Sequence, residues 1–242
     1  MKRLFCILSV YALILAACAD HNDSVTSPNK ITTQGVVDSS TVVKGTMTDS
    51  RDGQTYKTVT IGYQTWMAEN LNFETDASFC YNNDSTNCAK YGRLYTSGAA
   101  MDSMGIWSTN SKGCGHHGRN CLITYPARGI CPKGWHLPDS TEWEVLISAV
   151  GGRNEASKML KSKIGWNEDG NGTDAYSFTA LPTGFGVLNG TSEDEGNRTI
   201  FWSSSTDMII ENYYMSLSSH NFSAKLSATY VGYGFSVRCL KD

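Results

Sequence analysis

The sequence lacks the charge excess and the long apolar segments that mark several large classes of protein. The 20 Lys and Arg residues against 23 Asp and Glu leave a formal net charge of −3, which provides no basic stripe for nucleic acid. After the first residues, no apolar run is long enough to span a bilayer. No low-complexity tract and no repeat of fixed period interrupts the chain. These absences favour a globular domain and exclude nucleic acid as an expected partner.

Motifs for common catalytic and metal sites are also missing. The pattern Gly-x-Ser-x-Gly, which presents a nucleophilic serine in many hydrolases, does not occur. The oxygen-rich loop 165–174 has no Glu at the twelfth position of an EF-hand, so we expect a solvated turn rather than the alternative, a calcium site. Neighbouring carboxylates at Asp194 and Glu195 are expected to be solvated loop charge rather than an acid and base pair. The sequence therefore predicts no catalytic residue, no metal and no cofactor.

The N-terminal residues have the form of a lipoprotein signal. Lys2 and Arg3 precede an apolar run over 4–15, and Leu-Ala-Ala-Cys, ending at Cys18, has the form of a lipobox. The apolar run is shorter than the roughly 20 residues that a transmembrane helix needs. We expect residues 1–17 to be cleaved and Cys18 to carry palmitate and anchor the protein in a membrane. An ordinary signal peptide, in which Cys18 is incidental, is the alternative.

The residues that follow indicate a tether and then one domain. Residues 18–48 are rich in Ser, Thr, Asn and Asp, which is typical of a flexible linker, and 49–242 is long enough for one domain with a substantial core. Asp20 and Asp23, next to the acylation site, resemble surface-export signals of some Gram-negative lineages. We expect a cell-envelope protein, lipid-anchored in the outer membrane and exposed at the surface.

The cysteine count predicts a disulfide framework. Eight cysteines are present; the signal removes Cys6 and the lipid occupies Cys18, so an even number, six, remains in an oxidising compartment. Fifteen pairings are possible in principle. Spacing favours the pairs Cys80 with Cys88, Cys114 with Cys121, and Cys131 with Cys239. For the second pair, which flanks two histidines, a zinc site is the alternative, although the usual ligand spacing is missing.

Hydrophobic spacing predicts helices in the middle of the domain. Asp139 and Glu142 form a capping-box pattern ahead of a helix whose apolar residues recur at i, i+3, i+4 and i+7. That buried face consists of Trp143, Leu146, Ile147 and Val150. A second short helix is expected over 155–162, and a strand running into a short helix within 91–104.

Strand patterns occupy both ends of the domain. A hairpin is expected over 55–71 with its turn at Gly62-Tyr63, and a surface loop over 82–87. From Thr199 onward, short β-rich segments alternate with polar turns. Alternation in the last one places Phe235, Val237 and Cys239 on one face, against the core. Two short helices with antiparallel sheets and disulfides define an α+β domain.

Several motifs together resemble a known family. "IGYQTWMAENL", "NCAKYGRLYT", "CPKGWHLPDSTEW", "NGTDAYSFTALPTG", "FWSSS" and "GYGFSVRCLKD" look like the Fibrobacter-type major paralogous domain, or FISUMP. The resemblance implies a C-type-lectin-like fold, a secreted or lipid-anchored bacterial protein, no established enzymatic activity, and a terminal half-cystine. Calcium-dependent sugar binding does not carry over, because Glu-Pro-Asn, Gln-Pro-Asp and Trp-Asn-Asp are all absent.

We expect a displayed binding module whose extracellular ligand is a glycan or a protein. Its candidate ligand residues combine aromatic platforms with hydrogen-bonding groups, as recognition loops do. They are Asp207, Glu211, Asn212, Tyr213, Tyr214, His220, Asn221, Tyr230 and Tyr233. One alternative is an enzyme related to formylglycine-generating-type oxidases, and another is a structural surface-assembly protein. Within "ARGICPKGWHLPD", His136 is expected to be a core histidine that hydrogen-bonds a backbone carbonyl.

Overall fold

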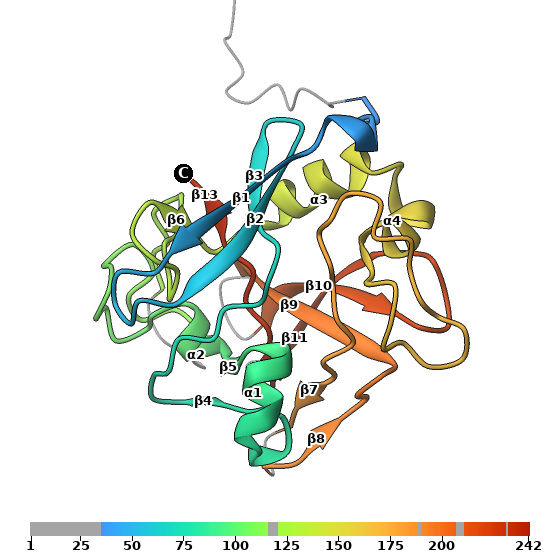
Figure 1. The fold of residues 1–242 in the computed structure, drawn as a ribbon. Coiled ribbons are helices and arrows are strands. Elements are labelled where there is room, and N and C mark those ends of the chain that lie inside the picture. Colours follow the sequence, from blue (N-terminus) through green and yellow to red (C-terminus); the bar gives the residue numbers. More distant parts are fainter. Residues whose placement is uncertain (1–34, 116–120, 188–189, 207–210, 231) are drawn as a thin grey trace, which may run out of the picture. The chain divides into compact units, whose positions relative to one another are not determined.

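The computed structural model describes residues 35–115, 121–187, 190–206, 211–230 and 232–242. Cys18, Asp207 and the two histidines between Cys114 and Cys121 lie outside these ranges. Within them the chain is α+β, with four α-helices and strands that pair antiparallel (Figure 1). Among the described residues, no helix combines the length and the apolar character needed to cross a membrane.

The helices and strands form three sheets with helices around them. The helices are α1 (Ser85–Tyr91), α2 (Ser97–Ala100), α3 (Ser140–Ala149) and α4 (Arg153–Leu160), with 3-10 turns η1 (Ser39–Thr41) and η2 (Tyr81–Asn83). The first sheet has the order β1 (Val43–Thr48), β2 (Thr55–Ile61), β3 (Gln64–Met67), β13 (Leu240–Lys241), β6 (Trp135–His136). The second has the order β11 (Lys225–Tyr230), β10 (Glu211–Ser218), β9 (Arg198–Thr206). The third has the order β4 (Ser78–Phe79), β5 (Leu94–Thr96), β12 (Gly234–Phe235), β7 (Phe185–Gly186), β8 (Ser192–Glu193).

The hairpin that the sequence predicts is present, but another strand precedes it. β2 and β3 pair around Gly62, whose positive φ of 62° is one that glycine adopts without a steric penalty. β1 pairs with β2 along its whole length, from Val43 opposite Thr60 to Thr48 opposite Thr55. The expected flexible linker through residue 48 is therefore wrong for its last six residues, which form an edge strand of the first sheet.

The helix signals agree with the structure in the middle of the chain. The strand that runs into a short helix, expected within 91–104, is also present as β5 and α2, but α1 is a helix that the sequence does not predict. The Asp139 side chain accepts from the backbone N–H of Glu142, whose own carboxylate accepts from the Asp139 N–H, so the capping box is complete. α4 begins at Arg153, two residues earlier than expected. The surface loop expected over 82–87 is wrong in part, because α1 begins at Ser85 after Asp84 caps it.

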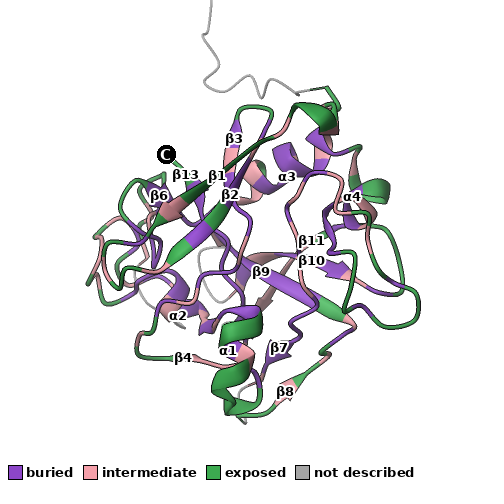
Figure 2. Ribbon diagram, viewed as in Figure 1, coloured by how far each residue is buried: buried purple, intermediate pink, exposed green. Residues whose placement is uncertain are grey.

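Two apolar clusters lie on opposite faces of the second sheet, in which β9 is mostly buried while β11 has no buried residue (Figure 2). Phe201 and Met215 belong to the first cluster, where Trp143 from α3 lies 4.6 Å from Trp66, measured between ring centroids. Trp202 belongs to the second cluster and lies 4.3 Å from the ring centroid of Phe235. Successive residues of β9 thus serve different clusters, because side chains alternate across a strand.

Three disulfides connect the pairs that spacing favours: Cys80–Cys88, Cys114–Cys121 and Cys131–Cys239. Because the sulfurs of Cys114 and Cys121 are bonded to each other, they are not the free thiolate pair that the zinc alternative requires. The bridge between Cys131 and Cys239 joins positions 108 residues apart. It fixes the final segment, which supplies an inner strand to both five-stranded sheets.

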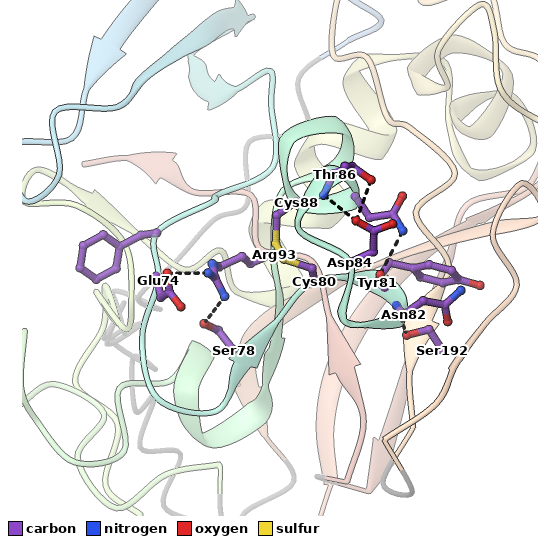
Figure 3. The surroundings of a disulfide bond; sticks show 12 residues. Glu74, Ser78, Cys80, Tyr81, Asn82, Asp84, Thr86, Cys88, Arg93 and Ser192 are labelled. Atoms are coloured by element: carbon purple, nitrogen blue, oxygen red, sulfur yellow. Dashed lines mark hydrogen bonds and ion pairs between the residues drawn. A yellow bond between two sulfur atoms is a disulfide. The ribbon is translucent and has the colours of Figure 1, made fainter.

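The bridge between Cys80 and Cys88 fastens α1 to the η2 turn before it (Figure 3). Asp84 lies between the two cysteines in the chain, and its carboxylate accepts hydrogen bonds from the N–H and hydroxyl of Thr86. Arg93, just after α1, forms an ion pair of 2.7 Å with Glu74. The helix that the sequence did not predict is therefore held by the disulfide at Cys88 and by the side-chain cap of Asp84.

His136 and Arg238 are the buried polar residues that depart most from expectation. His136 is buried as expected, but its ring nitrogens face two carboxylates, Oε1 of Glu142 at 2.9 Å and Oδ1 of Asp242 at 2.8 Å, so the expected backbone partner is wrong. Phe235, Val237 and Cys239 are buried together, as alternation predicts. Alternation places Arg238 on the other face of this segment from Val237 and Cys239. Its side chain is nevertheless only 1% exposed.

Candidate functional site

A groove on one face of the second sheet contains part of the predicted ligand region. We call it the basic groove; its volume is about 370 Å³. Its polar lining includes Arg153, Arg198, Tyr214, Ser216, Ser218 and Lys225. A space of this size falls at the lower end of ligand-binding pockets, which begin at about 300 Å³.

Strand register explains why these side chains share one face. In the antiparallel pairing, Lys225 lies opposite Ser216, and Ser216 opposite Ile200. Two residues along, Ser218 lies opposite Arg198. Directly opposed residues point to the same side of a sheet, so these form rows across the three strands. Leu217, between the two rows on β10, turns into the first apolar cluster.

The groove is cationic. Arg198 forms an ion pair of 3.4 Å with Asp194 and remains 45% exposed, and Arg153 forms an ion pair with Glu144. Neither carboxylate lines the groove. Surface ion pairs contribute little, so both guanidinium groups remain able to contact a ligand. Together with Lys225, three cations therefore border a row of serine hydroxyls.

A further cation lies behind the groove wall. Lys161 is fully buried, and its ammonium donates a 2.8 Å hydrogen bond to the backbone carbonyl of Ser218. Its Nζ lies 4.8 Å from the ring centroid of Trp166. Burial lowers the pKa of Lys161 to about 8, so the side chain is still largely protonated at neutral pH. It adds positive potential on the side of the groove away from solvent.

Of the predicted ligand residues that the structure describes, two line the basic groove, Tyr214 and Asn221. Tyr214 is half-buried, with its ring centroid 5.6 Å from that of Phe235. Asn221 is exposed, and its backbone carbonyl accepts a hydrogen bond from Ser157. Tyr214 therefore both packs against the core and presents an edge to the groove.

The other predicted residues are dispersed. Asn212 is buried and donates to the hydroxyl of Ser97, and Tyr233 stacks on Phe235 with the ring centroids 5.7 Å apart. Nδ1 of His220 lies 2.8 Å from Oε2 of Glu168.

On β10, Glu211 lies opposite the exposed Tyr230 of β11, and Tyr213 lies opposite Ala228. Asp207 lies outside the described residues. The predicted set therefore does not form one site.

Sequence reasoning missed the three cations of the basic groove. Arg153, Arg198 and Lys225 lie in three different elements, and each looks in isolation like ordinary surface charge. The alternation of Ser216 and Ser218 with apolar residues on one strand was the signal that a polar sheet face existed. Across the described residues, no three His, Cys, Asp or Glu side chains are grouped so as to hold a metal ion.

The fold and groove define a disulfide-bonded α+β domain with a cationic, hydroxyl-lined surface site. The family model described as the Fibrobacter succinogenes major domain matches residues 59–241, and the chain belongs to this family. No curated protein matches the chain, and no solved structure matches it.

Proposed function

We propose that this protein is a lipid-anchored cell-envelope module that binds an acidic polysaccharide in the basic groove and carries out no catalysis. The observation that supports this most is the set of three cations around serine hydroxyls, in a groove that no carboxylate of the described residues lines. Carboxylate or sulfate groups of a polysaccharide would pair with the cations. Its hydroxyl groups would hydrogen-bond to the serines.

The location and the finer fold are part of the same proposal. Cys18 would carry the lipid, and the residues between it and η1 would form the tether. This arrangement would display the domain from the outer membrane at the cell surface. Helices packed around antiparallel sheets, with a disulfide to the last segment, agree with a C-type-lectin-like fold.

The oxidase alternative receives less support from the cysteines. An oxidase of that type needs an accessible thiol. All six cysteines of the described residues are in disulfides. We therefore favour binding over catalysis, and titration of free thiols in the mature protein tests the point, because one or two reactive thiols would restore the oxidase hypothesis.

Glycan binding is tested with the full lipid-anchored chain in liposomes and an array of acidic and neutral polysaccharides. Lys225→Gln should lower the affinity for acidic polysaccharides by about tenfold, as expected for loss of a charge-assisted contact of about 1.5 kcal/mol. The matched control is Lys44→Gln, because Lys44 is also exposed on an edge strand but lies on β1, outside the groove. Binding to acidic polysaccharides should also weaken as salt rises.

Two results would contradict the proposal. Equal binding of neutral and acidic polysaccharides would remove the role of charge, and equal losses in Lys225→Gln and Lys44→Gln would remove the role of the groove. Self-association by sedimentation, with no glycan bound, would instead support the structural-assembly alternative.

A further inference from the structure

A second cavity contains a buried arginine and shares no lining residue with the basic groove. We call it the arginine cavity; its volume is about 300 Å³. Its polar lining includes Tyr56, Lys57, Asn70, Asn72, Lys90 and Arg238. These residues come from β2, the segment after β3, α1 and the final segment, so the cavity exists only in the folded domain.

Gly92, at the end of α1, closes one side of the arginine cavity. Its φ is 76°, and a Cβ at this position would lie 2.8 Å from the Cβ of Asn70. Only glycine lets the chain approach Asn70 this closely. The disulfide at Cys88, which also lines the cavity, holds α1 in place (Figure 3).

Arg238 brings a positive charge into this cavity without a paired carboxylate. Its Nε donates to Oδ1 of Asn70 at 2.7 Å, and its two Nη atoms donate to the backbone carbonyls of Met67, Phe178 and Thr179. These bonds use four of its five N–H groups, so among the described residues one N–H on Nη2 has no partner. Burial lowers the pKa of Arg238 to about 9, and the group stays charged at neutral pH.

Two more groups in the cavity have hydrogen-bonding capacity left. Oδ1 of Asn72 is buried and has no hydrogen-bond partner among the described residues. The hydroxyl of Tyr56 accepts from the backbone N–H of Asn72 at 3.0 Å, which leaves its own hydrogen for another acceptor. Burial raises the pKa of Tyr56, so the hydroxyl remains a donor. An unpartnered buried acceptor costs free energy, which a bound donor would recover.

The charged residues at the cavity rim are also net positive. Lys57 pairs with Glu69, with Nζ and Oε1 3.4 Å apart, and both line the cavity. Lys90, on α1, lines it too, and its partner Glu195 does not. With Arg238, three cations and one carboxylate face this space, which favours an anionic occupant.

We infer that the arginine cavity binds a small hydroxylated carboxylate, of the size and chemistry of a single sugar acid. The carboxylate accepts from the free N–H of Arg238 and from the hydroxyl of Tyr56. A neighbouring hydroxyl group of the ligand donates to Oδ1 of Asn72. The inference does not depend on the basic groove, and either site can be present without the other.

The test uses the full chain and isothermal titration with sodium D-glucuronate, with D-glucose and inorganic phosphate as comparisons. Glucuronate should bind, and glucose and phosphate should bind at least about tenfold more weakly, because glucose lacks the charge and phosphate lacks a hydroxyl group set apart from its anionic oxygens by a carbon framework. Asn72→Asp places a like charge beside the ligand and should abolish binding, while the backbone N–H that contacts Tyr56 is retained.

The matched control is Asn83→Asp, the same change at an exposed position that does not line the cavity. It should bind glucuronate normally, as should Lys225→Gln, which separates this site from the basic groove. Near-ultraviolet circular dichroism checks that each variant is folded. The inference is overturned if glucuronate does not bind the wild-type chain, if phosphate binds equally well, or if folded Asn72→Asp binds as the wild type does.

Discussion

Removal of the bridge between Cys131 and Cys239 should destabilise the domain more than removal of either short bridge. On the loop-entropy model, a disulfide that closes a loop of 108 residues stabilises the fold by about 5 kcal/mol, while one that closes 8 residues contributes about 2.5 kcal/mol. Single domains have total stabilities of about 5 to 15 kcal/mol. The double variant Cys131→Ala, Cys239→Ala should therefore be close to its unfolding limit at 37 °C.

Denaturant titration with linear extrapolation measures this difference. The variant for comparison is the double variant Cys80→Ala, Cys88→Ala, which removes a short bridge. Its loss of unfolding free energy should be about 2 to 3 kcal/mol smaller than that of the long-bridge variant. Both Cys131 and Cys239 are fully buried, so the loss of their sulfurs adds a cavity penalty in the same direction. An equal or larger loss in the short-bridge variant would refute the reasoning, because loop length would then not decide the effect.

Three further predictions concern polar residues of the core. Burial lowers the pKa of His136, but Glu142 and Asp242 raise it more, so the folded pKa exceeds the unfolded value of about 6.5. This stabilisation is complete below that value and is lost as pH rises through the folded pKa. The free energy of unfolding should therefore fall more in the wild type than in His136→Gln as pH rises above about 6.5. The prediction is contradicted if urea titrations at several pH values give the same change of unfolding free energy with pH for both proteins. In the same assay, the free energy of unfolding should fall by about 1 kcal/mol in Asp139→Ala. It should fall far less in Asp139→Asn, because Asn also caps helices. The free energy of unfolding should fall by about 3 kcal/mol or more in Arg238→Met, because several buried acceptors lose their donor. An unchanged free energy of unfolding would show that water molecules replace the lost donors.

The parts of the fold that the sequence predicts are those encoded by neighbouring residues. The capping box at Asp139 and the turn at Gly62 each need only a few adjacent positions. α1 was missed because its Ser, Thr and Asn residues have a loop-like composition. What holds α1 is the bridge at Cys88 and the burial of Tyr91, and neither can be judged from local composition.

The candidate sites were less predictable, because they depend on strand register and on contacts between distant residues. Nothing near Lys225 in the chain indicates that it lies opposite Ser216 on the next strand. The tyrosines offered as ligand groups were chosen by residue type, and Tyr233 is occupied in stacking on Phe235. Residue type thus identified the region of the basic groove, but not the cations in it.

The final segment shows why a buried arginine is better explained by a ligand than by packing. Cys239 faces the second apolar cluster and Leu240 the first, so the segment runs between two cores. A charge buried away from water carries a large desolvation penalty, so a buried cation normally has an anionic partner. Arg238 has no carboxylate partner among the described residues, and it lines a cavity whose lining also includes Asn72, with its unpartnered Oδ1. In the ligand that we infer, a carboxylate would accept from the free N–H of Arg238 and a hydroxyl group would donate to Oδ1 of Asn72.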